Sequence, residues 1–180
     1  MKKKLVLLLH GFDANGKSHF LPHLNKSLLP LGNIYSPDLP QSRNPDLAVW
    51  KKTIMKIVDG QPIDLVVGHS LGSVIAMNMV ANDEIKVKNL VSIAGSTGWK
   101  DLDIMNKFIT PPIALDKLKK SLNNFFVVHS YDDPYCAFEY GMILVKQAGA
   151  TGIFFANKGH FIVKELPEAV LDLIKNILSK

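Results

Sequence analysis

The most informative segment of the chain reads Gly68-His69-Ser70-Leu71-Gly72. It follows the apolar run at residues 64–67 and precedes a helical pattern at residues 74–81. A serine between two glycines, at a sharp turn from strand to helix, has the form of a nucleophile elbow. The glycines leave room for such a turn because no Cβ atom collides with the neighbouring backbone. We therefore predict that the Oγ atom of Ser70 stands exposed above a sheet as a nucleophile.

A candidate acid follows a later predicted strand. The apolar run at residues 125–128 ends at the polar segment His129-Ser130-Tyr131-Asp132-Asp133-Pro134, so two carboxylates come just after the strand. In the fold that uses this elbow, the acid follows the serine in the chain and the histidine follows the acid. We predict Asp133 as the acid and keep Asp132 as the alternative. The competing interpretation is an ordinary surface turn, in which Asp and Pro are common for conformational reasons.

A candidate base lies before the last predicted helix, where the apolar run at residues 152–156 ends in Asn157-Lys158-Gly159-His160. A serine hydroxyl is a poor nucleophile at neutral pH, and an imidazole can take its proton during attack and return it to the leaving group. A carboxylate then holds the imidazole in one tautomer. We predict His160 as the base, because Ser70, Asp133 and His160 follow the expected chain order.

Charge that develops on a substrate oxygen needs backbone N–H donors beside the serine. One donor is the residue after the nucleophile, Leu71, at the start of a helix whose positive end faces that oxygen. The other comes from the loop after the first predicted strand, which reads His10-Gly11-Phe12. We predict an oxyanion hole formed by the N–H groups of Phe12 and Leu71.

Apolar runs alternate with amphipathic stretches along the chain, as in α/β proteins. The expected strand and helix pairs are residues 5–9 with 20–29, 33–36 with 46–58, 64–67 with 71–81, 89–94 with 115–122, 125–128 with 138–148, and 152–156 with 166–178. We predict one α/β domain over residues 1–180. Its three layers would be helices on both faces of a mostly parallel sheet of about six strands, with the site at the carboxyl ends of the strands.

The longest irregular stretch, residues 96–113, is too short to form a separate lid domain. We therefore expect a minimal cap or none over the site. Trp99, Met105 and Phe108 lie in this stretch and could wall a substrate pocket. The alternative for each of them is packing on the core, the more common place for an apolar residue of a loop.

Composition narrows the class of protein. The 180 residues are 47% apolar and 21% charged, which is ordinary for a globular domain. The net charge of +5 comes from dispersed lysines without an interleaved aromatic stripe, so we expect no nucleic-acid partner. No segment approaches membrane-spanning length, so we expect no membrane partner. Cys136 is the only cysteine, which is compatible with a reducing compartment, and we expect the cytoplasm.

A rival motif overlaps the loop after the first strand. The segment from Gly11 to Ser18 satisfies the phosphate-binding pattern G-x-x-x-x-G-K-[ST] between a strand and a helix. A nucleotide enzyme would also need an acid at a strand end to hold magnesium, and the strand at residues 64–67 ends in Gly-His-Ser instead. Pro22 further indicates a loop or a late helix start. We keep a P-loop nucleotide-binding protein as an alternative.

The histidines suggest no metal site. His19 and His23 have the i, i+4 spacing of helical ligands, but Pro22 lies between them and no Glu or Cys completes a ligand set. We expect neither a metal nor another cofactor.

Taken together, the elbow, the Asp-Asp-Pro turn and the Gly-His before the last helix resemble the small α/β-hydrolases related to retinoblastoma-binding protein nine and their bacterial serine-hydrolase relatives. The resemblance spans nearly the whole chain and also includes His10-Gly11, Ser36-Pro37-Asp38-Leu39-Pro40, Trp50 and the segment from Ser130 to Tyr135. It implies that Ser70, Asp133 and His160 are nucleophile, acid and base. It also implies that residues 1–180 form one α/β-hydrolase domain, with a six-stranded sheet in the order 2-1-3-4-5-6 and almost no cap.

These observations lead to the expectation of a serine hydrolase, in particular a carboxylesterase that acts on small soluble esters through an acyl-enzyme at Ser70. An amidase or aminopeptidase-like serine hydrolase is a second enzymatic possibility. A binding protein that keeps the hydrolase fold without turnover is an alternative from another class, because a fold does not guarantee an activity. The substrate is expected to be a small ester or amide, and protein partners stay open.

Overall fold

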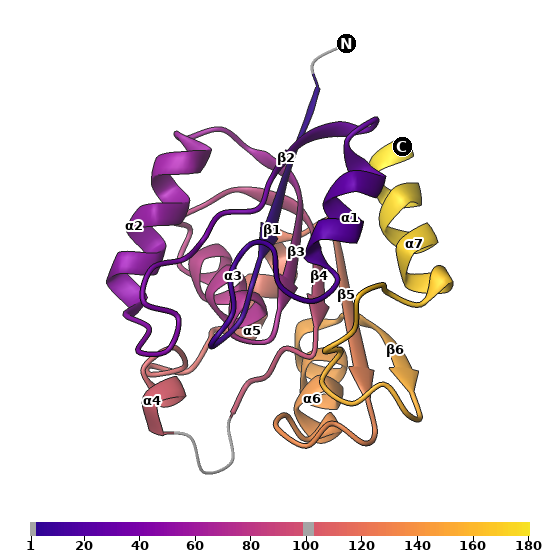
Figure 1. Cartoon of the computed structure of the whole chain (residues 1–180). Helices are drawn as coiled ribbons and strands as arrows, with labels where there is room; N and C mark the ends of the chain where they lie inside the picture. The colour runs from indigo at the N-terminus through magenta and orange to yellow at the C-terminus, as the bar shows by residue number, and fades with distance from the viewer. Residues whose placement is uncertain (1–2, 99–102) are drawn as a thin grey trace.

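A parallel sheet of six strands forms the centre of the computed structural model, which describes residues 3–98 and 103–180 (Figure 1). The strands are β1 (Lys4–Leu9), β2 (Gly32–Tyr35), β3 (Ile63–His69), β4 (Val87–Ile93), β5 (Asn124–Ser130) and β6 (Thr151–Phe155). Every neighbouring pair is parallel, and the order is β2-β1-β3-β4-β5-β6. The predicted strand number and order are confirmed, and the sheet is parallel throughout.

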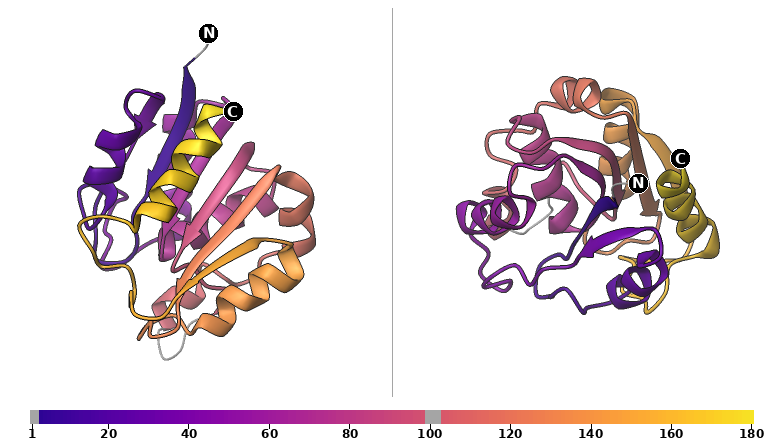
Figure 2. Two further views of the ribbon diagram at one scale, coloured as in Figure 1. Left: turned by 90° about the vertical axis from the view of Figure 1, so that its right-hand side faces the viewer. Right: turned by 90° about the horizontal axis from the view of Figure 1, so that it is seen from above.

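Helices cover both faces of this sheet (Figure 2). The helices are α1 (Leu21–Leu28), α2 (Leu47–Val58), α3 (Leu71–Ala81), α4 (Asp103–Asn106), α5 (Leu115–Ser121), α6 (Phe138–Ala148) and α7 (Glu168–Ser179). Helices α1 and α7 lie on one face, and α2, α3, α5 and α6 lie on the other. The chain is thus a single α/β domain with three layers, as predicted.

Alternation within the first strand shows why its sequence is continuously apolar. Leu7 and Leu9 contribute to the core under α2, α3, α5 and α6, whereas Val6 and Leu8 contribute to the core under α1 and α7. All four side chains are buried. A strand with helices on both faces has no solvated side, so alternation of apolar and polar residues disappears.

Helix α3 lies deepest in the fold. Every residue from Leu71 to Ala81 is buried, and the helix packs on β3 and β1. A helix that is apolar on all sides has no solvent-facing stripe and packs against other elements on every side. The turn between β3 and α3 is therefore anchored at both ends by buried elements.

The segment between β4 and α5 adds one short helix, α4, near the carboxyl ends of the strands (Figure 1). Within the described part of this segment no further helix or strand is present, in agreement with the predicted minimal cap. Helix α1 begins at Leu21 with Pro22 in its first turn, so the late helix start indicated by Pro22 is also confirmed. No helix in the described residues is both long enough and apolar enough to cross a membrane.

Candidate active site

The elbow serine has a backbone conformation that non-glycine residues rarely adopt. Ser70 has φ 54° and ψ −122°, between the last residue of β3 and the first residue of α3. The two glycines of the motif allow this turn. A Cβ atom at Gly68 would lie 2.5 Å from the Cα of Ser73, and one at Gly72 would lie 2.3 Å from the carbonyl oxygen of Leu9. Strand, turn and helix therefore meet in the conformation of a nucleophile elbow, with no space for a Cβ atom at either glycine. Ser70 is not exposed as expected: only 5% of its surface is accessible, because it lies within a cavity that it lines together with neighbouring loops.

Three predicted residues come together at the carboxyl ends of β3, β5 and β6. The Nε2 atom of His160 lies 2.9 Å from the Oγ of Ser70. On the other side of the ring, Nδ1 lies 2.8 Å from Oδ2 and 3.0 Å from Oδ1 of Asp133. Since the ionised carboxylate only accepts, Nδ1 carries the hydrogen and Nε2 is free to accept from the serine hydroxyl. This is the geometry a general base needs.

The Asp133 carboxylate is enclosed. Its side chain is fully buried, and Oδ1 accepts hydrogen bonds from the backbone N–H groups of Tyr135 and Cys136, both at 2.9 Å. Burial alone would raise the pKa of Asp133, but the hydrogen bond and charge of His160, with these N–H groups, outweigh it and hold the pKa below its usual value. The carboxylate is therefore ionised and oriented toward the imidazole.

Asp132, the alternative acid, has a different role. Its Oδ1 accepts from the hydroxyl of Ser130 at 2.5 Å and from the backbone N–H of Gly159 at 2.9 Å. These hydrogen bonds, that of Ser130 first, lower the pKa of the exposed Asp132 carboxyl. Asp132 therefore joins the loop after β5 to the loop that carries His160, and it does not contact the imidazole of His160 in any hydrogen bond of the described residues.

The loop around His160 is a tight turn. Gly159 and Phe161, which flank the histidine, have φ values of 50° and 54°. The Phe161 ring is buried and meets Phe155 edge to face at 5.9 Å. A buried anchor next to the histidine, together with two left-handed residues, fixes the direction in which the imidazole points.

The predicted oxyanion donors lie beside the serine. Leu71 is the first residue of α3, so its N–H has no acceptor within the helix. Phe12 lines the same cavity as Ser70. The preceding residue, Gly11, lies so close to Ser70 that a Cβ atom on it would be 2.8 Å from the Ser70 Cβ. His10 supports this loop, because its Nδ1–H donates to the Gly11 carbonyl at 2.8 Å while Nε2 accepts from Leu39 N–H at 2.7 Å.

A cavity of about 360 Å³ opens above Ser70. Its lining residues are Gly11, Phe12, Asp13, His19, His69, Ser70, Met105, Tyr135, His160 and Ile162. Met105 therefore lines the cavity that contains Ser70. Phe108 does not: it is fully buried in the core, where its ring meets Trp50 at 5.4 Å, so that prediction is wrong. Trp99 lies outside the described residues.

The P-loop alternative fails on its backbone N–H groups. In a phosphate-binding loop these groups point at the phosphates. Here the N–H of Gly16 donates to the Asp38 carboxylate at 2.8 Å, and the N–H groups of Asn15 and Lys17 donate to side chains within the loop. A carboxylate thus occupies part of the place where a phosphate would bind, and the loop is instead tied to the segment after β2.

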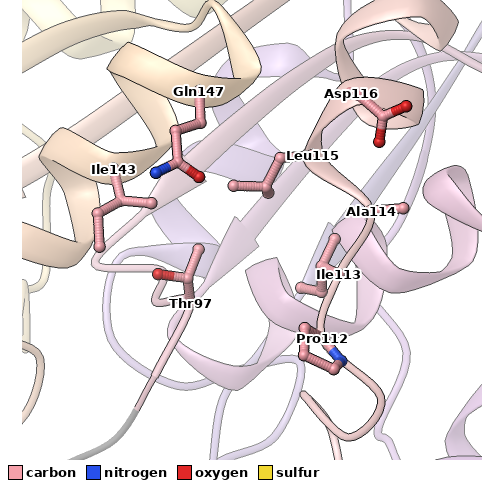
Figure 3. Close-up of a pocket in the computed structure, with 8 residues that line it drawn as sticks. All are labelled: Thr97, Pro112, Ile113, Ala114, Leu115, Asp116, Ile143 and Gln147. Atoms are coloured by element: carbon pink, nitrogen blue, oxygen red, sulfur yellow. The ribbon is translucent and has the colours of Figure 1, made fainter.

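A second cavity, of about 630 Å³, lies between the beginning of α5, helix α6 and the loop after β4 (Figure 3). Thr97, Leu115, Ile143 and Gln147 are among its lining residues. It shares no described lining residue with the cavity above Ser70, and Asp116 is the one ionisable side chain among its described lining residues.

One group of side chains has the composition of a metal site. The donor atoms of Asp133, Cys136 and His160 lie within 4.8 Å of one another. However, Asp133 and His160 already bind each other, and burial raises the pKa of the Cys136 thiol, which disfavours the thiolate that binds metals. The contacts fit an acid–base pair beside a buried thiol better than a ligand set.

Sequence reasoning missed several residues of the cavity wall. His19, Tyr135 and Ile162 line it, and none of them was predicted as a pocket residue. Tyr135 meets the His160 ring edge to face at 5.1 Å. The segment from Ser130 to Tyr135 carries part of the family resemblance, and this is the signal in the sequence that points to Tyr135.

The site and the fold agree with the comparison to known families. A family model described as Serine hydrolase matches residues 6–168. The chain therefore belongs to the serine hydrolase family. Over 186 residues it is 24% identical to YdeN of Bacillus subtilis (strain 168), which is named as a hydrolase; the match covers 98% of this chain and 97% of that protein.

Solved structures of hydrolases have the same fold. The ydeN gene product of Bacillus subtilis superposes with a TM-score of 0.86 at 23% identity, over 98% of this chain and 100% of that one. The meta-cleavage product hydrolase CumD from Pseudomonas fluorescens IP01 gives a TM-score of 0.75 at 14% identity, over 99% of this chain and 91% of that one. Est1E from Butyrivibrio proteoclasticus, solved with ferulic acid bound, gives a TM-score of 0.71 at 16% identity, over 98% of this chain and 87% of that one.

Proposed function

We propose that the protein is a carboxylesterase that cleaves small esters through an acyl-enzyme at Ser70. The observation that carries this proposal is the position of the His160 imidazole, which bridges the Oγ of Ser70 at 2.9 Å and the buried carboxylate of Asp133 at 2.8 Å. The membership of this chain in the serine hydrolase family supports hydrolysis as the reaction class. The choice of esters rests on the cavity.

In the proposed reaction, the Ser70 hydroxyl gives its proton to Nε2 of His160 as Oγ attacks the ester carbonyl carbon. The negative oxygen of the tetrahedral intermediate is stabilised by the N–H groups of Phe12 and Leu71. His160 then gives the proton to the departing alkoxide, which leaves as an alcohol and breaks the ester C–O bond. A water molecule, activated by the same imidazole, releases the acid and restores Ser70.

Asp133 has an electrostatic role in this scheme. When His160 takes up the proton it becomes a cation, and the ionised Asp133 carboxylate stabilises it. The low pKa of Asp133 keeps the carboxylate charged throughout. Its hydrogen bond also holds Nδ1–H in place, so that Nε2 always faces the serine.

The cavity favours small uncharged esters. Phe12 and Ile162 at its rim are 37% and 58% exposed, and Met105 lies at its wall, so an apolar acyl or alcohol group would bury these surfaces. A volume of about 360 Å³ is at the small end for ligand pockets. The described lining contains no lysine or arginine that would attract an anionic substrate.

Cys136 is a buried free thiol, which is compatible with activity in the cytoplasm.

Intact-mass spectrometry after exposure to a fluorophosphonate tests the nucleophile. We expect one adduct on the wild-type protein, none on Ser70→Ala, and strongly reduced labelling of His160→Ala. Rapid hydrolysis of p-nitrophenyl acetate and butyrate with slow hydrolysis of the matching anilides would support an esterase. Faster hydrolysis of the anilides would point to an amidase, and a folded protein that is neither labelled nor active would show a binding protein instead.

A further inference from the structure

His69, the residue before the candidate nucleophile, is bound to the loop that carries the candidate base. Its side chain is buried, and its Nε2 atom lies 2.8 Å from the backbone carbonyl oxygen of His160. Because a carbonyl oxygen only accepts hydrogen bonds, Nε2 must carry a hydrogen and donate it. The two imidazole rings lie 5.1 Å apart. His69 thus fixes the main chain of the residue whose side chain faces Ser70.

No sheet hydrogen bond can provide this link. Strand β3, which ends at His69, and strand β6, which precedes the loop of His160, are separated in the sheet by β4 and β5. The elbow and the histidine loop are therefore joined through side chains, namely the contact of Ser70 with the imidazole of His160 and the contact of His69 with the carbonyl of His160. The second contact acts on the backbone and does not depend on the catalytic groups.

The His69 ring is itself held in one orientation. Phe20 and His19 each meet it edge to face, with ring centroids 5.3 Å away. Burial lowers the pKa of His69 to about 3, so the ring is neutral over the pH range in which esterases are assayed. A neutral ring has one N–H, and the contact with His160 assigns it to Nε2. Among the described residues the buried Nδ1 atom has no hydrogen-bond partner.

We propose that His69 is a positioning residue, whose Nε2–H holds the backbone of His160 and thereby sets the distance between the imidazole of His160 and the hydroxyl of Ser70. The inference rests on the proposed function, since it concerns the reaction at Ser70. It predicts that the rate of the chemical step depends on a donor at the Nε2 position of residue 69, whereas substrate binding does not.

Two amide substitutions separate the donor from other effects of the side chain. The amide nitrogen of a glutamine lies as many bonds from Cα as the Nε2 atom of histidine, whereas that of an asparagine corresponds to Nδ1. Both variants lose the ring, so His69→Asn is the matched control for His69→Gln. Relative to His69→Gln, we expect His69→Asn to lower kcat for p-nitrophenyl acetate about tenfold, with the KM values of the two variants within about twofold of each other, because one hydrogen bond is lost. His69→Gln should keep most of the wild-type kcat.

Equal kcat values for the two variants would overturn the inference, provided that the wild-type protein is labelled by the fluorophosphonate and Ser70→Ala is not. If the wild type is not labelled, the proposed function fails and the inference fails with it. A second measurement needs no variant. The ¹⁵N chemical shifts of the His69 imidazole in the wild-type protein report which nitrogen carries the hydrogen; the Nε2–H tautomer supports the inference, and the Nδ1–H tautomer overturns it.

Discussion

Gly11 and Ser70 approach each other so closely that a Cβ atom on Gly11 would lie 2.8 Å from the Cβ and 3.2 Å from the Oγ of Ser70. The loop after β1 and the elbow after β3 can therefore meet only if one of the two residues has no side chain. The same approach brings Phe12, a proposed oxyanion donor, to the wall of the cavity above Ser70.

Replacement of Gly11 by alanine should consequently impair the reaction. The added methyl group would push the loop away from Ser70 and displace the N–H of Phe12 from the developing oxyanion, and loss of one such donor costs about 10²–10³-fold in kcat. We expect a fall in kcat for p-nitrophenyl acetate of at least about tenfold. Gly60→Ala is the control: a Cβ atom there meets nothing within 4 Å, and its φ of 68° strains the backbone only before β3, at the end of that strand opposite to Ser70. Equal kcat values for Gly11→Ala and the wild type would contradict the proposed oxyanion hole.

The adjacent acids Asp132 and Asp133 should differ sharply in their effect on catalysis. Asp133→Asn removes the charge that orients His160, and in other triads such a change lowers kcat by about 10⁴-fold. Asp132→Asn affects only the hydrogen bonds to Ser130 and Gly159, so we expect a loss of less than about tenfold. Steady-state hydrolysis of p-nitrophenyl acetate by both variants decides the matter. A larger loss for Asp132→Asn than for Asp133→Asn would assign the acid to Asp132.

Substitution of Met105 should change substrate preference, whereas substitution of Phe108 should lower the stability of the fold. Phe108 is a fully buried core residue, so Phe108→Ala should lower the free energy of unfolding by about 3–5 kcal/mol. Met105 lines the cavity, so Met105→Ala should change the ratio of kcat/KM between p-nitrophenyl acetate and the butyrate. Urea unfolding and a comparison of the two esters measure these effects. An unchanged ester ratio in Met105→Ala would show that Met105 does not contact the acyl group.

Stability should fall as the pH drops from 7.5 to 5.5. Burial lowers the pKa values of His10, His69 and His129 from the ordinary 6.5. Below that value the unfolded chain binds protons that the folded chain does not, so the free energy of unfolding decreases by up to about 1.4 kcal/mol per pH unit for each histidine. Asp133, whose pKa is lowered, contributes stability that is lost only at more acidic pH.

Urea unfolding at pH 7.5, 6.5 and 5.5 measures this dependence on pH. His129→Asn removes one of the three buried imidazoles and should reduce the slope without touching the site loop that carries His160. A free energy of unfolding that stays constant across these three pH values would contradict the assignment of neutral, buried histidines.

Most of the fold could be predicted because its determinants are local. The run from Leu5 to Leu9 is apolar on both faces, and the glycines around Ser70 allow a sharp turn, so periodicity and motif were sufficient for strands, helices and elbow. The segment between β4 and α5 has no such periodicity. Sequence alone could therefore not show that Met105 faces the cavity while Phe108 faces Trp50.

The candidate site also has a part that the sequence predicts and a part that only the structure shows. Ser70, Asp133 and His160 were predictable because each follows a recognisable strand, and the structure brings them together. The contact of His69 with the carbonyl of His160 spans 91 positions of the chain. It involves a backbone atom, which no residue type reveals, and only the three-dimensional course of both loops shows it.

The wide separation of Ser70 from His160, 90 positions along the chain, also has a consequence for biosynthesis. A ribosome delivers the elbow long before it delivers the histidine, so a nascent chain that ends before β6 has the proposed nucleophile without the proposed base. Reactivity at Ser70 then begins only when β6 and its loop have joined the sheet. A fluorophosphonate would thus label only full-length, folded protein, and translation products truncated before His160 would not be labelled.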